Sequence, residues 1–172
     1  QFVGYWQDIN LIHENQDYLI SKLSNNKIIA NSLKSTPDSG STMLHIRRRD
    51  YLNMKEELSI DYYEKALHKA SKKIKNFNYD VFTDDKEWAT SNNLFSDAKN
   101  IYSLSSSRED TIFTFSEMLK YENYIISNST FSLIPAILSK SINKLVYAPT
   151  PWFKKSNKII DYPTKWIGIE NN

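Results

Sequence analysis

The stretch "TMLHIRRRDYLNMKEELSIDYYEKALHKASKKIKNFNYDVFT", residues 42–83, contains the clearest structural pattern in the chain. It opens with a short apolar segment at residues 42–47 and closes with another at residues 79–83, and both are typical of buried strands. Between them, Ser59 is a suitable N-cap, and apolar residues recur at the spacing of one helix face: Ile60, Tyr63, Leu67, Ala70 and Ile74. Strand, helix and strand in this order predict a parallel pair with a right-handed crossover.

The same alternation continues on both sides of this stretch. We predict further strands at residues 99–103, 124–127 and 144–149. We predict further helices at residues 9–23, 86–92, 108–123 and 129–141. Strands and helices that alternate in this way form mostly parallel sheets. The predicted fold class is therefore α/β, a Rossmann-like parallel sheet with helices on both faces.

The composition excludes several classes of protein. The chain has 172 residues, of which 40% are hydrophobic, and this suits a folded domain with a sizeable core. Because there is no cysteine, disulfides, thiolate metal sites and cysteine nucleophiles are excluded. The formal net charge is only +2 and the lysines are scattered, so we expect no nucleic-acid partner.

Glycine is scarce, and this limits how the chain can bind phosphate. The three glycines, Gly4, Gly40 and Gly168, lie far apart. Gly-rich phosphate loops of the dinucleotide-binding or P-loop type therefore cannot exist in this chain. A phosphate group would have to be bound by side chains or by helix N-termini.

Polar clusters follow three of the predicted strands: "HIRRRD" at residues 45–50, "TDD" at residues 83–85 and "SNST" at residues 127–130. In open α/β sheets, ligands bind outside the carboxyl ends of the strands, so we expect these clusters to meet along one edge. Two arginines at a strand end make a cationic clamp for a diphosphate. The helix N-terminus after Asn128 offers N–H groups to the same anion, and Asp84 can accept two N–H donors from guanine. Together they predict a site for a nucleoside diphosphate.

Each cluster also has a purely structural interpretation, which the sequence leaves open. Asp84 or Asp85 can cap the following helix, and Asn128 or Ser129 can do the same after its own strand. His45 alternates with apolar neighbours and can be a core histidine. We expect no metal site, because adjacent carboxylates at a strand end point to opposite faces and the three histidines are scattered.

These clusters also resemble the motifs of a known family. The segment "HIRRRDY" at residues 45–51 resembles the HxRRxDY motif of α-1,2-fucosyltransferases, glycosyltransferase family 11. Four further segments resemble motifs of the same family, in the same order: "GYWQD" from Gly4, "VFTDD" at 81–85 with Trp88, "SNSTFS" at 127–132 and "YAPTPWF" at 147–153. Two departures are Arg49, at a position where the family usually has glycine, and "SLI" at 132–134 where it has SWW.

The resemblance implies a domain organisation. The family has the GT-B fold, and this chain resembles its C-terminal, GDP-fucose-binding half, a piece of a longer polypeptide. We expect residues 1–41 to be a linking helix and loop from an N-terminal acceptor domain, residues 42–155 to be the donor domain, and residues 156–172 to be a tail that packs back on it.

The resemblance also implies a role for each of seven site residues. They are Arg47, which holds the diphosphate and is the catalytic residue; Arg48, which supports it; His45 and Asp84, on the guanine side; and Asn128, Ser129 and Thr130, at the phosphates. The reaction would be an inverting transfer of L-fucose from GDP-β-L-fucose to a galactose-terminated oligosaccharide, without a metal or other cofactor. For Asp50, an ion pair that orients Arg47 or Arg48 is favoured over the role of general base.

Alternatives to this function remain open. One is a transferase for another sugar nucleotide, and another is a degenerate, non-catalytic nucleotide-binding module or an interaction domain with an acidic partner. The composition, rich in Asn, Lys, Ile and Ser, favours a bacterial source and polysaccharide biosynthesis. We expect a cytoplasmic location, with peripheral association with the inner membrane as an option.

Overall fold

The computed structural model describes residues 8–104, 107–155 and 160–171. In these ranges the strands form a six-stranded sheet in the order β3-β2-β1-β4-β5-β6, and every neighbouring pair is parallel. The strands are β1 (Ser41–Ile46), β2 (Asn78–Thr83), β3 (Ile101–Ser103), β4 (Asn123–Ile125), β5 (Val146–Thr150) and β6 (Trp166–Glu170). The predicted α/β, Rossmann-like sheet is confirmed. The order reverses between β1 and β4, the position at which such sheets bind ligands.

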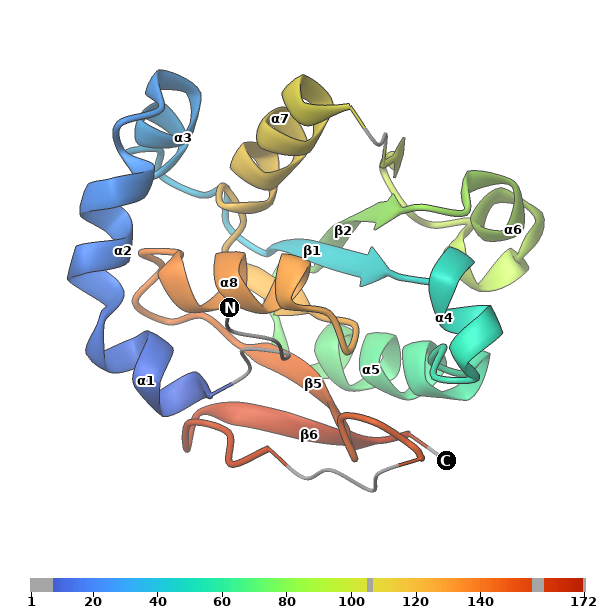
Figure 1. Ribbon diagram of the computed structural model, residues 1–172. Coiled ribbons are helices and arrows are strands. Elements are labelled where there is room, and N and C mark those ends of the chain that lie inside the picture. The colour runs from blue at the N-terminus through green and yellow to red at the C-terminus, as the bar shows by residue number, and fades with distance from the viewer. Residues whose placement is uncertain (1–7, 105–106, 156–159, 172) are drawn as a thin grey trace.

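Helices cover both faces of the sheet, as predicted (Figure 1). They are α1 (Ile9–Glu14), α2 (Gln16–Leu23), α3 (Lys27–Ser32), α4 (Arg49–Met54), α5 (Ile60–Lys73), α6 (Lys86–Ser91), α7 (Arg108–Met118) and α8 (Thr130–Leu138), with a 3₁₀ turn, η1 (Asn93–Phe95). Helices α1 to α3, α7 and α8 contribute to one hydrophobic cluster, and α5, α6 and η1 contribute to the other.

Strand β1 divides its side chains between these two clusters, because successive strand residues point to opposite faces. All six of its residues are buried; Met43 packs into the cluster under α8, and Leu44 and Ile46 pack into the cluster under α5. This explains why the segment has no polar alternation: a central parallel strand is covered on both sides.

Several local predictions were wrong. The helix predicted at residues 9–23 is two helices, broken at Asn15, whose side chain donates to the carbonyl of Leu11. The predicted helix at 108–123 ends at Met118, because β4 already begins at Asn123. On α5, Ser59 is the N-cap as predicted, but Ile60 is 39% exposed, and Tyr62 and Ala66 are buried beside Tyr63, Leu67 and Ala70 instead.

Four of the described elements were not predicted: α3, α4, η1 and β6. Within the predicted tail, β6 pairs with β5 along the whole of its length. The three domain bounds at residues 1–41, 42–155 and 156–172 stay predictions. In the segment before β1, Ile9, Ile29 and Leu33 are buried against the α7–α8 side of the core. Assignment of the chain to one half of a GT-B fold stays a prediction. None of the helices in the described residues has the length and apolarity needed to span a membrane.

Candidate functional site

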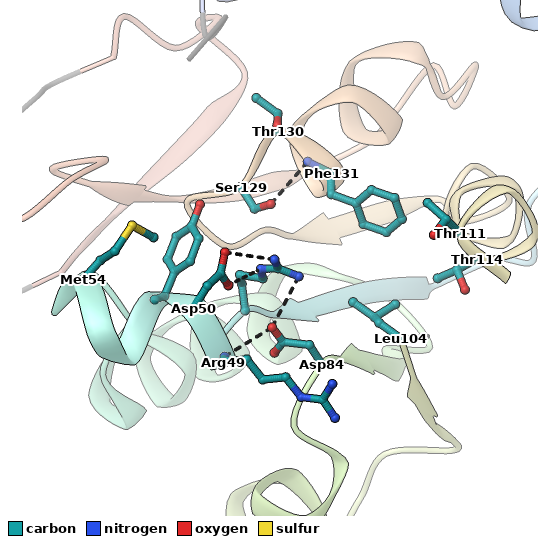
Figure 2. Close-up of a pocket in the computed structure, with 12 residues that line it drawn as sticks. Arg49, Asp50, Met54, Asp84, Leu104, Thr111, Thr114, Ser129, Thr130 and Phe131 are labelled. Atoms are coloured by element: carbon teal, nitrogen blue, oxygen red, sulfur yellow. Dashed lines mark hydrogen bonds and ion pairs between the residues drawn. The ribbon is translucent and has the colours of Figure 1, made fainter. Parts of the chain in front are cut away.

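The carboxyl ends of β1, β2 and β4 meet at a cavity of about 570 Å³, seen in Figure 2. Its lining comes from these three strand ends, from the end of β3 and from α4, α7 and α8, namely Arg47, Arg49, Asp50, Tyr51, Met54, Asp84, Leu104, Thr111, Thr114, Ser129, Thr130 and Phe131. The three polar clusters therefore converge along one edge of the sheet. Of the seven predicted site residues, Arg47, Asp84, Ser129 and Thr130 line the cavity, whereas His45, Arg48 and Asn128 do not.

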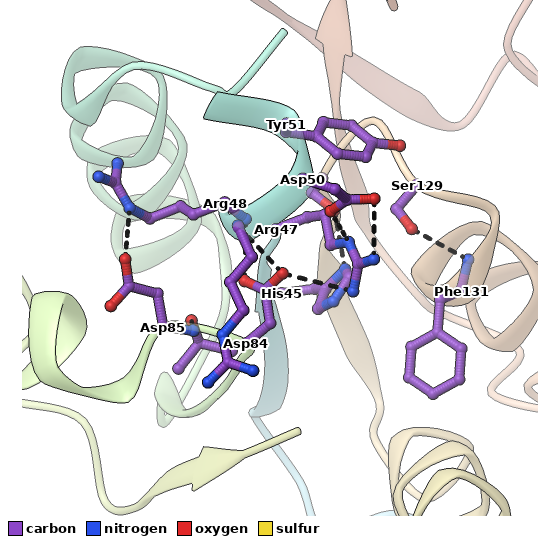
Figure 3. Close-up of polar contacts among 12 residues, drawn as sticks. His45, Arg47, Arg48, Asp50, Tyr51, Asp84, Asp85, Ser129 and Phe131 are labelled. Carbon is purple, nitrogen blue, oxygen red and sulfur yellow. Dashed lines mark hydrogen bonds and ion pairs between the residues drawn. The ribbon is translucent and has the colours of Figure 1, made fainter. Parts of the chain in front are cut away.

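Arg47 is held in place by two carboxylates. It follows the last residue of β1, and its Nε and Nη2 lie 2.9 Å and 3.0 Å from the two carboxylate oxygens of Asp50 (Figure 3). Its Nη1 lies 3.3 Å from Oδ2 of Asp84. The ion pair expected for Asp50 is confirmed. A guanidinium carries five N–H donors, so this arrangement leaves two of them for a ligand.

Asp84 is buried, with 3% of its surface exposed, and it anchors the start of α4. Its Oδ1 accepts the backbone N–H of Arg48 at 2.8 Å, and its Oδ2 accepts that of Arg49 at 3.3 Å. Together with Arg47, these donors occupy most of the acceptor sites of the carboxylate. The predicted guanine contact stays a prediction, and it would use the acceptor capacity that remains.

The three consecutive arginines have different environments. Arg47 and Arg49 line the cavity, but Arg48 turns away from it, and its guanidinium lies 3.9 Å from the centre of the Trp88 ring. Its Nε also donates to Asp85 at 3.1 Å. Asp85 in turn caps α6, since its Oδ1 accepts the backbone N–H of Trp88. The capping interpretation is therefore correct for Asp85, while Asp84 has a different role.

His45 lies beneath the cavity rather than in its wall. Its ring is fully buried, and Nδ1 lies 2.8 Å from the hydroxyl of Ser127 at the end of β4. Burial, and secondarily the charge of Arg47, lower the pKa of His45 to about 3, so the imidazole is neutral at pH 7. Its Nε2 has no hydrogen-bond partner in the part of the chain that the structure describes. The predicted contact of His45 with guanine stays a prediction.

The cluster after β4 combines a cap and a buried link. Ser129 is the N-cap of α8, and its hydroxyl accepts the backbone N–H of Phe131 at 3.3 Å. Asn128 is fully buried. Its side-chain amide donates to the backbone carbonyl of Glu56, and its backbone carbonyl accepts a hydrogen bond from the hydroxyl of Tyr51 at 3.0 Å. Asn128 therefore positions the start of α8 from below, while Ser129 and Thr130 face the cavity.

The formal charges of the lining side chains cancel. Arg47 and Arg49 are balanced by Asp50 and Asp84. The sequence predicted a positively charged clamp with Asp50 paired to one of its arginines, but it did not predict that Asp84 would also pair with Arg47. Any net attraction for an anion must arise from how these four groups are placed. The described residues contain no group of three or more His, Asp or Glu side chains able to hold a metal ion.

Comparison with known proteins places this arrangement in a family. The sequence profile described as Glycosyl transferase family 11 matches residues 2–170. The chain belongs to glycosyltransferase family 11. The resemblance inferred from the motifs is thus confirmed. The segment from Gly4 that contributed to it lies mostly outside the described residues.

Two relatives of this family 11 chain are bacterial. The O-antigen biosynthesis glycosyltransferase WbnK of Escherichia coli is 31% identical over 165 residues, which cover 87% of this chain and 54% of that protein. An alpha-1,2-colitosyltransferase of Escherichia coli is 28% identical over 169 residues, which cover 90% of this chain and 57% of that protein. The chain therefore spans about half the length of these relatives. No solved structure matches it with comparable significance.

Some lining residues of this family 11 site had no signal in the sequence. Thr111 and Thr114 come from the middle of α7, which is remote from any strand end along the chain. Phe131 belongs to the "SNSTFS" motif but was not assigned a role, and its ring lies 6.0 Å from that of His45. The tertiary path of α7, which passes beside the cavity, brings these side chains to the site.

Proposed function

We propose that this family 11 chain binds GDP-β-L-fucose in the cavity and that it serves as the donor-binding half of an inverting α-1,2-fucosyltransferase. The observation that carries the proposal is the fixed guanidinium of Arg47, held by Asp50 and Asp84 beside the hydroxyls of Ser129 and Thr130. A held guanidinium with two spare N–H groups suits a diphosphate, which accepts parallel hydrogen bonds. The start of α8 adds backbone N–H groups on the same side.

In the proposed reaction, a hydroxyl of the acceptor attacks C1 of the fucose from the face opposite the diphosphate. The new C–O bond forms as the bond from C1 to the β-phosphate oxygen breaks, and the hydroxyl proton passes to a base. Negative charge grows on the departing GDP, and Arg47 is oriented to meet it. Preorganised donors of this kind contribute about 3–4 kcal/mol each to stabilising a transition state. Arg47 is thus the proposed catalytic residue.

Asp50 is a poor candidate for the base. Both of its oxygens already bind Arg47, at 2.9 Å and 3.0 Å, so they are occupied by this pair rather than directed at an acceptor hydroxyl. We assign it the role of orienting Arg47. The base belongs, in this proposal, to a part of the protein that contacts the acceptor.

The proposal includes a galactose-terminated oligosaccharide as acceptor, no requirement for a metal ion and a cytoplasmic location. Because the chain spans about half the length of its relatives, we expect GDP binding from this chain alone and transfer only from a protein that includes the acceptor half. Transfer that is unaffected by EDTA would support the metal-independent route, and loss of transfer that Mg²⁺ restores would contradict it.

The first test is nucleotide binding measured by calorimetry with the 172-residue chain. We expect GDP to bind more tightly than UDP or ADP, and Arg47→Ala to weaken GDP binding at least tenfold while circular dichroism shows an intact fold. Exposed Lys72 on α5 offers a matched control, and Lys72→Ala should leave GDP affinity unchanged. A folded chain that produces no heat with GDP would remove the proposal.

A second candidate differs in the sugar. One relative is an alpha-1,2-colitosyltransferase, so a colitosyl donor is the main competitor to fucose. Transfer assays with the complete protein and either nucleotide-activated sugar would decide between them by the ratio of kcat/KM values. Tight GDP binding with no transfer from either donor would favour the non-catalytic module instead.

A further inference from the structure

The charges around Arg47 raise a problem for binding a diphosphate. Arg47 carries one positive charge, but it is paired with two carboxylates, Asp50 and Asp84. The three groups together are therefore net negative by one unit. Hydrogen bonds from Arg47 can orient a diphosphate, but the cluster as a whole does not attract one.

One further charged side chain lines the cavity, and it is Arg49. No carboxylate of the described residues lies within ion-pair distance of its guanidinium, whereas Arg47 and Arg48 are both paired. Its backbone N–H is fixed on Asp84, but its side chain is exposed. In Figure 2 the guanidinium extends to the far side of Asp84 from Ser129, and rotation about the side-chain bonds can move it.

We propose that Arg49 is a second determinant of donor affinity: its unpaired guanidinium offsets the negative Arg47–Asp50–Asp84 cluster and attracts the diphosphate of the nucleotide. This inference rests on the proposed function and assigns different roles in donor binding to Arg47 and Arg49. Arg47 supplies direction, because its geometry is fixed by two partners. Arg49 supplies the missing charge, because no carboxylate of the described residues pairs with it.

The test is calorimetry of GDP and of guanosine binding to the wild-type chain and to two variants. Arg49→Gln removes the charge and keeps most of the side-chain length, and we expect GDP affinity to fall about tenfold at low salt. Arg49→Lys keeps the charge and should stay within about threefold of wild type. Affinity for guanosine, which carries no phosphate, should be the same in all three proteins.

Salt provides a second readout. Because charges are screened at high ionic strength, the gap between wild type and Arg49→Gln should narrow from about tenfold to less than about threefold at 1 M salt. Lys72→Gln changes the net charge of the protein by the same amount on exposed α5 and should leave GDP affinity unchanged. That control separates a local effect of Arg49 from a change in overall charge.

The outcomes separate this inference from the function on which it rests. If wild type and Arg49→Gln bind GDP with the same affinity, the inference is overturned and the proposed function still stands. An equal loss in Arg49→Gln and Arg49→Lys would also overturn it, since shape rather than charge would then be responsible. A wild-type chain that is folded but does not bind GDP would remove both.

Discussion

Where β1 meets β4, the strand ends are joined by uncharged hydrogen bonds, whereas where β1 meets β2 they are joined by ion pairs. On the β4 side, His45 is hydrogen-bonded to Ser127, and the backbone carbonyl of Asn128 accepts a hydrogen bond from the hydroxyl of Tyr51. On the β2 side, Arg47 binds Asp84 and Arg48 binds Asp85. Both sides support one cavity, but they should respond differently to a change in charge.

The difference indicates which strand ends hold the edge of the cavity in a fixed geometry and which have a geometry that a ligand can change. The β4-side groups are buried and neutral, so an approaching anion leaves their geometry unchanged. The β2-side groups carry charges beside the cavity, and a diphosphate would compete with the carboxylates for Arg47. Variants on each side, followed by unfolding measurements, test whether the two sides differ in this way.

The largest effect is expected on the β2 side, from Asp84→Asn. This change removes the charge of a buried carboxylate that binds Arg47 and two backbone N–H groups, and breaking such a buried pair should cost about 3 kcal/mol of unfolding free energy. Urea denaturation measures this. Asp85→Asn is the matched control, because it keeps the cap of α6 and loses only a partly exposed ion pair, worth about 1 kcal/mol. Equal losses in the two variants would contradict the special role of Asp84.

The β4 side should instead respond to pH through His45. Its pKa is about 3 in the folded protein and 6.5 in the unfolded chain, so between these values the unfolded state binds more protons. Stability contributed by the neutral ring is complete above pH 6.5 and decreases as the pH falls toward 3. At pH 4.5 we expect a loss of about 2–3 kcal/mol relative to pH 7.5.

Denaturation of wild type and His45→Gln at both pH values isolates this effect, because the carboxylates titrate in both proteins. The variant should lose about 2–3 kcal/mol less than wild type between pH 7.5 and 4.5. Identical pH dependence in the two proteins would mean that His45 is solvated or charged in the folded state. His13→Gln, at an exposed position on α1, serves as the control and should behave like wild type.

The smallest effect is expected for the contact between Arg48 and Trp88. The guanidinium lies 3.9 Å from the ring centre, and a partly desolvated contact of this type contributes about 1 kcal/mol. A double-mutant cycle with Trp88→Leu and Arg48→Met measures the coupling directly. A coupling energy of zero would show that Arg48 is held by Asp85 alone.

Strands β1 to β5 and the polar positions that follow β1, β2 and β4 were predictable, because each depends on a short-range pattern. The βαβ unit at residues 42–83 has a buried strand, an N-cap and a helical stripe within one continuous segment. Strand β6 was missed because "WIGIE" is short and follows irregular sequence, and it becomes a strand by pairing with β5. Local sequence contains no information about that partner.

The directions of the three arginines could not be predicted for a similar reason. Arg47, Arg48 and Arg49 are identical in type and adjacent, and what separates them is the location of Asp84, Asp85 and Trp88, which come from a different strand and helix. The position of the polar clusters at the carboxyl ends of parallel strands predicted which segments meet. The ion pair of Asp50 was predicted, but the pairs of Asp84 with Arg47 and of Asp85 with Arg48 were not.

Glu56, which lies between α4 and α5, links Asn128 at the β4 side of the cavity to residues 154 and 155, far away along the chain. Its carboxylate accepts the backbone N–H groups of Lys154 and Lys155, at 2.7 Å and 3.0 Å, and its carbonyl accepts the side chain of Asn128. Those two amides are shielded from hydrogen–deuterium exchange only while the α4–α5 connection stays closed against them. Their exchange rates therefore measure how often the contacts of Glu56 beneath the cavity open, and the measurement needs no label in the cavity itself.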